Sequence, residues 1–196
     1  MRTRDTDKQE LVKQTAIQMI VENGLESFSL NKLAKACGIS VATLYIYYKD
    51  KDDLIISIAV DEAEKMGSQM LQDFDPELPF EEGLRQQWKN RAAQMLNNTV
   101  NIRFFEQLRT SSYEEKVHET FGSVFRDAMG RFMTNAIERG EIDPLPIEVY
   151  WSVAFAPLYN LIRFHVEGRS LAGKPFRMTD EIMWQTFDLV LKALKK

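Results

Sequence analysis

The side chains best suited to binding nucleic acid are concentrated in residues 29–51, which read SLNKLAKACGISVATLYIYYKDK. Small residues at the start of a short helix, here Val41 and Ala42, let a backbone approach base edges in the major groove. Hydroxyls, tyrosine rings and lysines further along the stretch suit the flanking phosphates. This combination indicates a DNA contact rather than catalysis.

Two short helices are expected to position these side chains. Ser29 can cap the first, with its hydroxyl accepting a free backbone N–H. Gly38 supplies the positive φ of a tight exit turn, and Ser40 caps a second helix from Val41 to about Tyr47. The order of cap, helix, glycine, cap and helix predicts a helix-turn-helix.

This stretch resembles the DNA-binding signature of TetR-family transcriptional repressors. Cys37 stands where the family usually has alanine, and Tyr48 where it usually has phenylalanine; both can still fill a small core. Beyond about residue 70 the resemblance rests on length and helical layout alone. The residues that match the family pattern are Ser29, Leu33, Ala34, Gly38, Ile39, Ser40, Thr43, Leu44, Tyr45, Tyr47, Tyr48, Lys51 and Leu54.

The resemblance implies a role for each residue of the signature. Some would meet phosphates and others would face bases. Ile46, between two presumed DNA-facing tyrosines, fits either a contact to a sugar or methyl group or packing on the first helix. An N-terminal arm with Arg2 and Arg4 either reaches the duplex or stays silent. The expected DNA-binding set is Ser29, Ser40, Val41, Ala42, Thr43, Tyr45, Tyr47 and Lys51.

The charge distribution agrees with a DNA-binding N-terminus. The 196-residue chain has a net charge of −4, yet its first 50 residues hold seven basic and six acidic side chains. The polar start shows no signal peptide, and no apolar run is long enough to span a bilayer. A single cysteine, Cys37, cannot form an internal disulfide, so a cytoplasmic setting is expected.

Helical periodicity dominates the whole chain and predicts an all-α protein of about nine helices. Residues 1–51 would form a three-helix DNA-binding head, and a fourth helix, about 51–72, would connect it onward. Residues 52–196 would form a larger effector-binding and dimerisation domain. Within it we expect a long helix from about Tyr113 to Arg139, and one over about 146–167 bent at Pro157.

The helix expected over about 146–167 is apolar on nearly all sides, which predicts burial on more than one face. The resemblance implies a two-fold, four-helix dimer interface built from the last two helices. The alternative is that these helices only complete a monomer core. The residues expected at the interface are Phe155, Leu158, Ile162, Phe187, Val190 and Leu194.

Large and soft side chains on the central helices suggest an effector pocket, because the resemblance implies one in this region. The competing interpretation is that an aromatic stripe at helical spacing is simply core. A pocket of this lining would favour a hydrophobic or planar small molecule, with His118 as a further polar neighbour. The pocket residues expected are Trp88, Met95, Phe105, Phe121, Phe125, Tyr159 and Arg163.

The sequence offers no set of residues for catalysis, and neither a cofactor nor a metal is predicted. The two histidines, His118 and His165, lack partners at metal-ligand spacing. Residues 168–175, GRSLAGKP, match phosphate-loop spacing, but Pro175 stands where serine or threonine must hold magnesium. We therefore predict a homodimeric repressor, released from a palindromic operator by a small effector. The alternative is a helical ligand- or protein-binding scaffold whose head no longer engages DNA.

Overall fold

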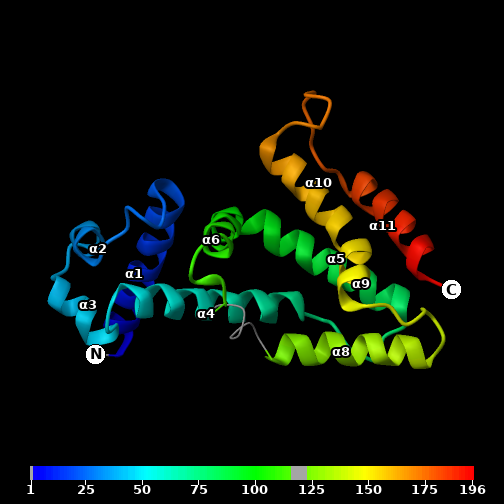
Figure 1. Ribbon diagram of the computed structural model, residues 1–196, viewed down its shortest axis with the longest axis horizontal. Coiled ribbons are helices and arrows are strands. Elements are labelled where there is room, and N and C mark those ends of the chain that lie inside the picture. The colour runs from blue at the N-terminus through cyan, green and yellow to red at the C-terminus, as the bar shows by residue number, and fades with distance from the viewer. Residues whose placement is uncertain (1, 116–122) are drawn as a thin grey trace. The chain divides into compact units, whose positions relative to one another are not determined.

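The computed structural model describes residues 2–115 and 123–196, and these fold into ten α-helices without a strand (Figure 1). The predicted all-α class is confirmed. The helices are α1 Arg2–Asn23, α2 Leu30–Cys37, α3 Val41–Tyr47, α4 Lys51–Met70, α5 Phe80–Asn97, α6 Thr99–Arg109, α8 Ser123–Glu138, α9 Ile147–Ala154, α10 Ala156–Glu167 and α11 Asp180–Leu194.

Packing divides the described residues into two compact units. The head unit comprises the described residues up to 65 together with 98–115, so it contains α1–α3, most of α4, and α6. The body unit comprises residues 66–97 and those from 123 onward, and it contains α5 and α8–α11. α4 begins in the head unit and its last residues belong to the body unit.

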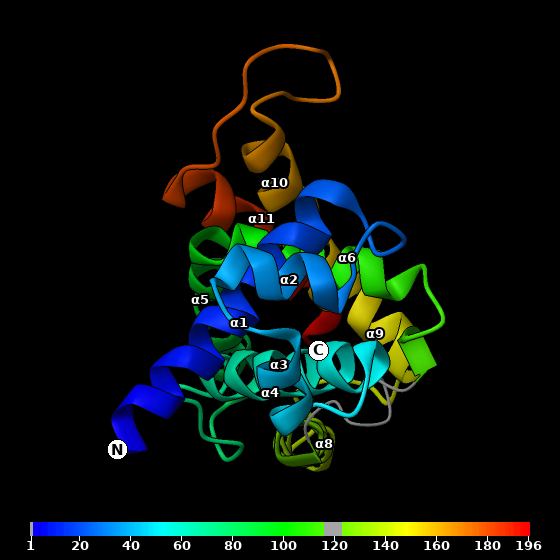
Figure 2. The ribbon, with the colours of Figure 1, turned by 90° about the vertical axis from the view of Figure 1, so that its left-hand side faces the viewer.

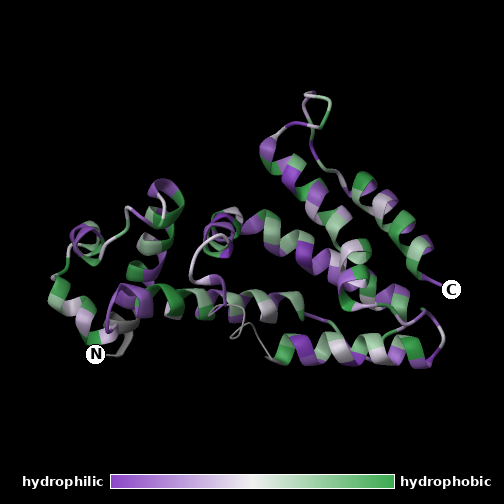
Figure 3. Cartoon of the chain, in the orientation of Figure 1, coloured by the Kyte–Doolittle hydropathy of each residue, from purple (hydrophilic) through white to green (hydrophobic). Residues whose placement is uncertain are grey.

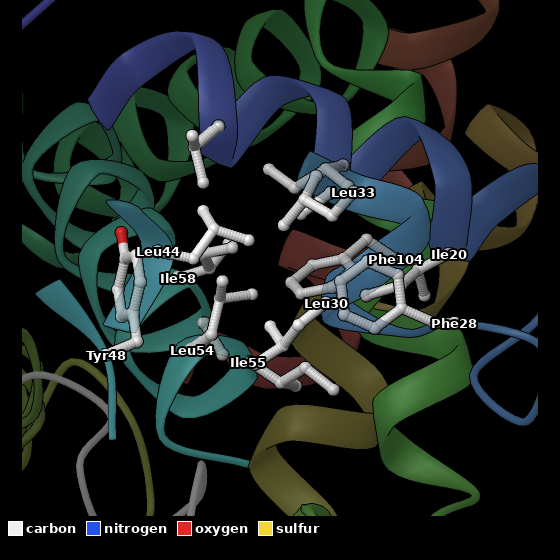
Figure 4. Packing of buried hydrophobic residues seen from close by; sticks show 14 of the residues in the cluster. Ile20, Phe28, Leu30, Leu33, Leu44, Tyr48, Leu54, Ile55, Ile58 and Phe104 are labelled. Carbon is white, nitrogen blue, oxygen red and sulfur yellow. The ribbon is translucent and has the colours of Figure 1, made fainter. Parts of the chain in front are cut away.

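The head unit is built on a single apolar cluster that collects side chains from five helices (Figure 4). Helices as short as α2 and α3 are marginal in isolation, so their stability depends on this tertiary packing. Leu33 from α2 and Leu44 from α3 are both completely buried in it. Phe104 from α6 is buried in the same cluster, so a helix distant in sequence helps hold the helix-turn-helix in place.

Aromatic side chains form the core of the body unit. Phe132 of α8 lies 5.2 Å from the Phe74 ring and 5.9 Å from the Phe80 ring, measured between centroids. This packing requires Gly83, because a Cβ atom there would lie 2.3 Å from the Phe132 ring. On the other side of α5, Trp88 packs edge-on against Phe187 of α11 at 5.4 Å.

The single bent helix expected over 146–167 is instead two helices, α9 and α10, with Phe155 between them. Phe155 has φ −125° and ψ −28°, outside the α-helical values. Pro157 lacks the N–H that a continuous helix would donate to Val153, so the ladder breaks before it. The helix expected from about Tyr113 lies partly outside the described residues, and its described part includes α8.

Each helix carries both hydrophobic and hydrophilic residues (Figure 3). Such mixed surfaces suit helices that bury one stripe and leave the other in water. No helix in the described part of the chain combines the length and the apolar character needed to cross a membrane.

Candidate functional site

The turn between α2 and α3 is fixed by local hydrogen bonds that the sequence encodes. The Ser29 hydroxyl accepts from the Lys32 backbone N–H at 3.4 Å, and the Ser40 hydroxyl accepts from the Thr43 N–H at 3.1 Å. Gly38 takes the left-handed conformation at φ 65°. The Ser40 and Thr43 hydroxyls are also 2.9 Å apart. The start of α3 is therefore held in one geometry.

Helices α2 and α3 lie toward the viewer in Figure 2, and the residues of α3 divide into a buried and a solvent-exposed face. Leu44 is completely buried, whereas 56% of Tyr45 and 75% of Ile46 are exposed. Val41 and Tyr47 are half-buried against the head cluster. Ile46 is therefore mostly in solvent and is not buried in the head cluster. The open face presents Ala42, Tyr45 and Ile46.

Lys51 lies at the start of α4 and points back toward the turn after α1. Its ammonium donates to the Leu25 carbonyl at 3.0 Å and lies 5.9 Å from the centre of the Phe28 ring. Because an ammonium has three N–H donors, this bond leaves donors for a phosphate. Lys51 thus ties α4 to the turn that leads into α2.

The link from α3 to α4 is also capped on both sides. The Asp50 carboxylate accepts from the Asp53 N–H, and the Asp53 carboxylate accepts from the Lys49 N–H, both at 2.8 Å. The first bond satisfies a free N–H in the first turn of α4, and the second satisfies the N–H of the residue before the cap. Tyr113 donates to Asp52 at 2.6 Å, and burial together with this bond raises the pKa of the Tyr113 hydroxyl. The link is therefore as constrained as the turn before it.

A family model described as bacterial regulatory proteins, tetR family, matches residues 8–58, which include α2, α3 and the start of α4. Over the full length of both chains, the fold superposes on a TetR family transcription regulator from Marinobacter aquaeolei VT8 with a TM-score of 0.86 and 26% identity. These two similarities show a TetR-like fold for the whole chain and the DNA-binding region of the TetR family at residues 8–58.

Two curated relatives are also named as regulators. An uncharacterized HTH-type transcriptional regulator of Haemophilus influenzae is 34% identical over 90 residues, 46% of this chain and 48% of its own length. A fatty acid metabolism regulator protein of Bacillus subtilis is 27% identical over 131 residues, 65% of this chain and 66% of its own. The chain therefore spans about half to two thirds of the curated relatives it matches.

The described residues expected to line an effector pocket are divided between the two units. Phe125 and Tyr159 lie in the body unit beside the Arg91 side chain, and Trp88 is buried on the same helix as Arg91. Met95 is half-buried on α5. Phe105 instead packs in the head unit, with its ring 5.5 Å from that of Phe104.

Arg163, also expected at the pocket, is exposed and pairs with Glu167 at 3.4 Å. Phe121 and His118 lie outside the described residues. The part of the chain that the structure describes contains no group of three or more His, Cys, Asp or Glu residues placed to hold a metal ion.

Arg91 is the residue that sequence reasoning missed. It is 1% exposed, and its Cζ lies 4.0 Å from the centre of the Phe155 ring. One signal was available: Arg91 follows the buried Trp88 by three residues, so both lie on the same face of α5. The packing of α9 and α10 against that face could not be predicted from the residue pattern of α5 alone.

The six residues predicted for a dimer interface are already buried within a single chain. Large apolar side chains that remain exposed on α9, α10 and α11 are Ile147, Val149, Trp151, Val166 and Leu189.

Proposed function

We propose that this chain is a homodimeric repressor of the TetR family that acts in the cytoplasm and binds a palindromic operator. The observation that carries the proposal is the solvent face of α3, where Tyr45 and Ile46 project from a helix whose start is fixed by Ser40. A recognition helix held in one geometry and open to water on one face is suited to entering a major groove. Exposed aromatic and apolar side chains on so short a helix need a partner to explain them.

The residue roles follow from position on α3 and around it. Val41, Ala42 and Tyr45 would face bases, with a thymine methyl a suitable partner for Val41. Thr43 and Tyr47 would meet phosphates on one side, and Ser29 and Lys51 on the other. The Ser40 and Thr43 hydroxyls already bond each other, so both would approach a phosphate as one polar unit.

Two copies would place two recognition helices about 34 Å apart, one turn of duplex, and so read a palindrome. The exposed apolar residues of α9–α11, Trp151 and Leu189 among them, support pairing through that region. Large exposed apolar side chains on neighbouring helices commonly mark an association surface.

The effector would be a small hydrophobic or aromatic molecule bound in the body unit. Support comes from the aromatic side chains around α5 and from a Bacillus relative that is named for fatty acid metabolism. A ligand that favours a head spacing unsuited to the operator lowers operator affinity by shifting the population.

Binding to DNA that flanks the chain's own gene tests the proposal. Fluorescence anisotropy across a salt series should show saturable, palindrome-dependent binding that weakens steeply with salt. A variant with Thr43→Ala and Tyr45→Ala should lose it. Weak binding that is equal in wild type and variant, with random-sequence selection yielding no motif, would favour the alternative of a helical scaffold with a silent head.

A further inference from the structure

The Arg91 guanidinium is buried in the body unit without a negative partner. Its Nη1 donates to the Tyr159 hydroxyl at 2.6 Å and lies 3.7 Å from the Met70 sulfur. Its Nε and Nη2 have no hydrogen-bond partner. None of the ion pairs formed by residues 2–115 and 123–196 includes it. A buried cation of this kind is usually paired.

Three aromatic rings surround the cation and explain only part of its placement. The Arg91 Cζ lies 4.0 Å from the Phe155 ring centre, 4.8 Å from that of Trp151 and 5.4 Å from that of Phe125. Ring faces attract a cation, but they offer no acceptor to N–H groups that point along the guanidinium plane. Burial lowers the pKa of Arg91, yet a guanidinium stays protonated, so the need for an acceptor persists.

The two unbonded nitrogens are the pair that recognises a carboxylate. Nε and Nη2 lie on the same edge of the planar guanidinium, and that edge forms two parallel hydrogen bonds with a carboxylate. The opposite nitrogen, Nη1, is the one that Tyr159 already occupies. The side chain is therefore held from one side with its bidentate edge unused.

A second polar atom nearby also lacks a partner. The Tyr150 hydroxyl is buried and unbonded, and it interacts electrostatically with Arg91. Tyr150 lies on α9, whose end contributes the Trp151 ring to the cluster around Arg91. The body unit thus holds a second buried polar group without a partner, and it interacts with the guanidinium.

We propose that Arg91 binds the carboxylate of an organic acid whose remaining body is apolar or aromatic, and that this acid is the effector of the regulator. The regulatory half rests on the proposed function; the binding half does not. A single planar edge and one cation match a carboxylate monoanion better than a phosphate dianion, which calls for more donors. The rings of Phe125, Trp151 and Phe155 suit the apolar remainder.

Trp151 is the side chain expected to respond when the acid enters. Its indole contacts the guanidinium and is also 36% exposed, so it links the buried charge with the surface. Binding should therefore change tryptophan fluorescence, and the change should be absent in a Trp151→Phe variant.

The test is a titration of the full chain with sodium decanoate and with 2-naphthoate, each beside the primary alcohol of the same carbon skeleton. Binding is followed by tryptophan fluorescence and by the rise in Tm. At least one acid should bind more than about tenfold tighter than its alcohol. Equal binding of acid and alcohol, an equal response to inorganic phosphate, or no response to either acid would overturn the proposal.

Two variants and a control separate binding from folding. Arg91→Met removes the charge and Arg91→Lys keeps the charge without the bidentate edge; both should lose the preference for the acid. Arg131→Met removes an exposed arginine of the same unit, paired with Glu77 at 3.2 Å, and should keep it. A preference that survives in the folded Arg91→Met variant would show that Arg91 serves packing alone.

The outcomes for the ligand site and for the regulator are distinguishable. If acids bind through Arg91 but the chain binds no DNA, the site stands and the proposed function fails. If the chain binds its operator but binds neither acid more tightly than the matching alcohol, the proposed function stands and the ligand site fails.

Discussion

The indole N–H of Trp88 on α5 donates to the carbonyl oxygen of Ala154, the last residue of α9, at 2.8 Å. Both residues are completely buried. The carbonyls at the end of a helix have no partner within it, so a buried helix end needs one from elsewhere. Trp88 supplies that partner where the chain breaks before Pro157. The end of α9, which Pro157 sets locally, is therefore stabilised by a side chain of α5, a helix far away in the sequence.

Replacing Trp88 by phenylalanine should reveal the value of this hydrogen bond. The variant keeps an aromatic ring against Phe187 but leaves the Ala154 carbonyl buried without a donor. We expect the free energy of unfolding to fall by about 1–3 kcal/mol, measured by denaturant unfolding. Trp184→Phe is the matched control, because Trp184 also packs on Phe187 and is half-buried. An equal loss in both variants would mean that ring size matters and the N–H does not.

The close approach of α5 and α8 gives a paired prediction at two glycines. Gly83→Ala would place a Cβ atom 2.3 Å from the Phe132 ring, so it should destabilise the protein by about 1–3 kcal/mol through overpacking. Gly130→Ala on α8 meets nothing within 4 Å and should stabilise by about 0.5–1 kcal/mol, because alanine favours a helix. The measurement is the thermal unfolding of the two variants and the wild type, compared by their stability. Similar shifts in both would contradict this account of the packing.

The helix-turn-helix was predictable because its determinants are local. Ser29, Gly38 and Ser40 set caps and a turn through bonds to residues within a few positions, and the structure has α2 and α3 at the predicted boundaries. The same holds for the all-α class, which follows from periodicity.

The arrangement of the body was less accessible because it depends on contacts between residues far apart in sequence. The break at Phe155 shows that Pro157 ends one helix and starts another, where a bend was expected. Arg91 lies 59 to 68 positions from Tyr150 and Tyr159 in the sequence, so their convergence has no local signature. Burial of Phe187 and Val190 in one chain likewise follows from packing that a single-helix pattern cannot specify.

Because Ile46 is exposed, substitutions there are expected to change operator binding without changing stability. Because 75% of the residue is exposed, Ile46→Ala should change the free energy of unfolding by less than about 0.5 kcal/mol. Ile46→Glu should be equally stable but should lose operator binding, since a carboxylate on the open face of α3 is repelled by phosphates. Anisotropy with the operator and thermal unfolding are measured on both variants. Full operator affinity in Ile46→Glu would remove this face of α3 from the interface.

Lys51 makes a structural hydrogen bond and is also predicted to contact a phosphate. The salt dependence of operator affinity distinguishes the two roles. Lys51→Met should destabilise the head unit by about 1 kcal/mol, through loss of the bond to Leu25. It should also lower the slope of log affinity against log salt by about one. Exposed Lys35 on α2 provides a control, since Lys35→Met lacks the structural loss. An unchanged slope in Lys51→Met would leave Lys51 with the structural role alone.

Ser40 has a structural role as the cap of α3 and a predicted role in DNA binding. Replacements that cap equally well but differ in charge separate the two roles. Serine, asparagine and aspartate all cap a helix well, because each offers an oxygen to the free N–H groups. Ser40→Ala should therefore destabilise the protein by about 0.5–2 kcal/mol, whereas Ser40→Asp and Ser40→Asn should hold stability near wild type.

Operator affinity should follow a different order from stability. Asparagine is neutral, so Ser40→Asn should bind the operator nearly as well as wild type. Ser40→Asp places a negative charge beside Thr43, whose hydroxyl is 2.9 Å from that of Ser40, and should bind at least tenfold more weakly at low salt. Anisotropy at low and high salt is the measurement, because a charge effect of this kind diminishes as salt rises. Equal affinity of the aspartate and asparagine variants would place the N-terminus of α3 away from the phosphates and would require another docking face for the head.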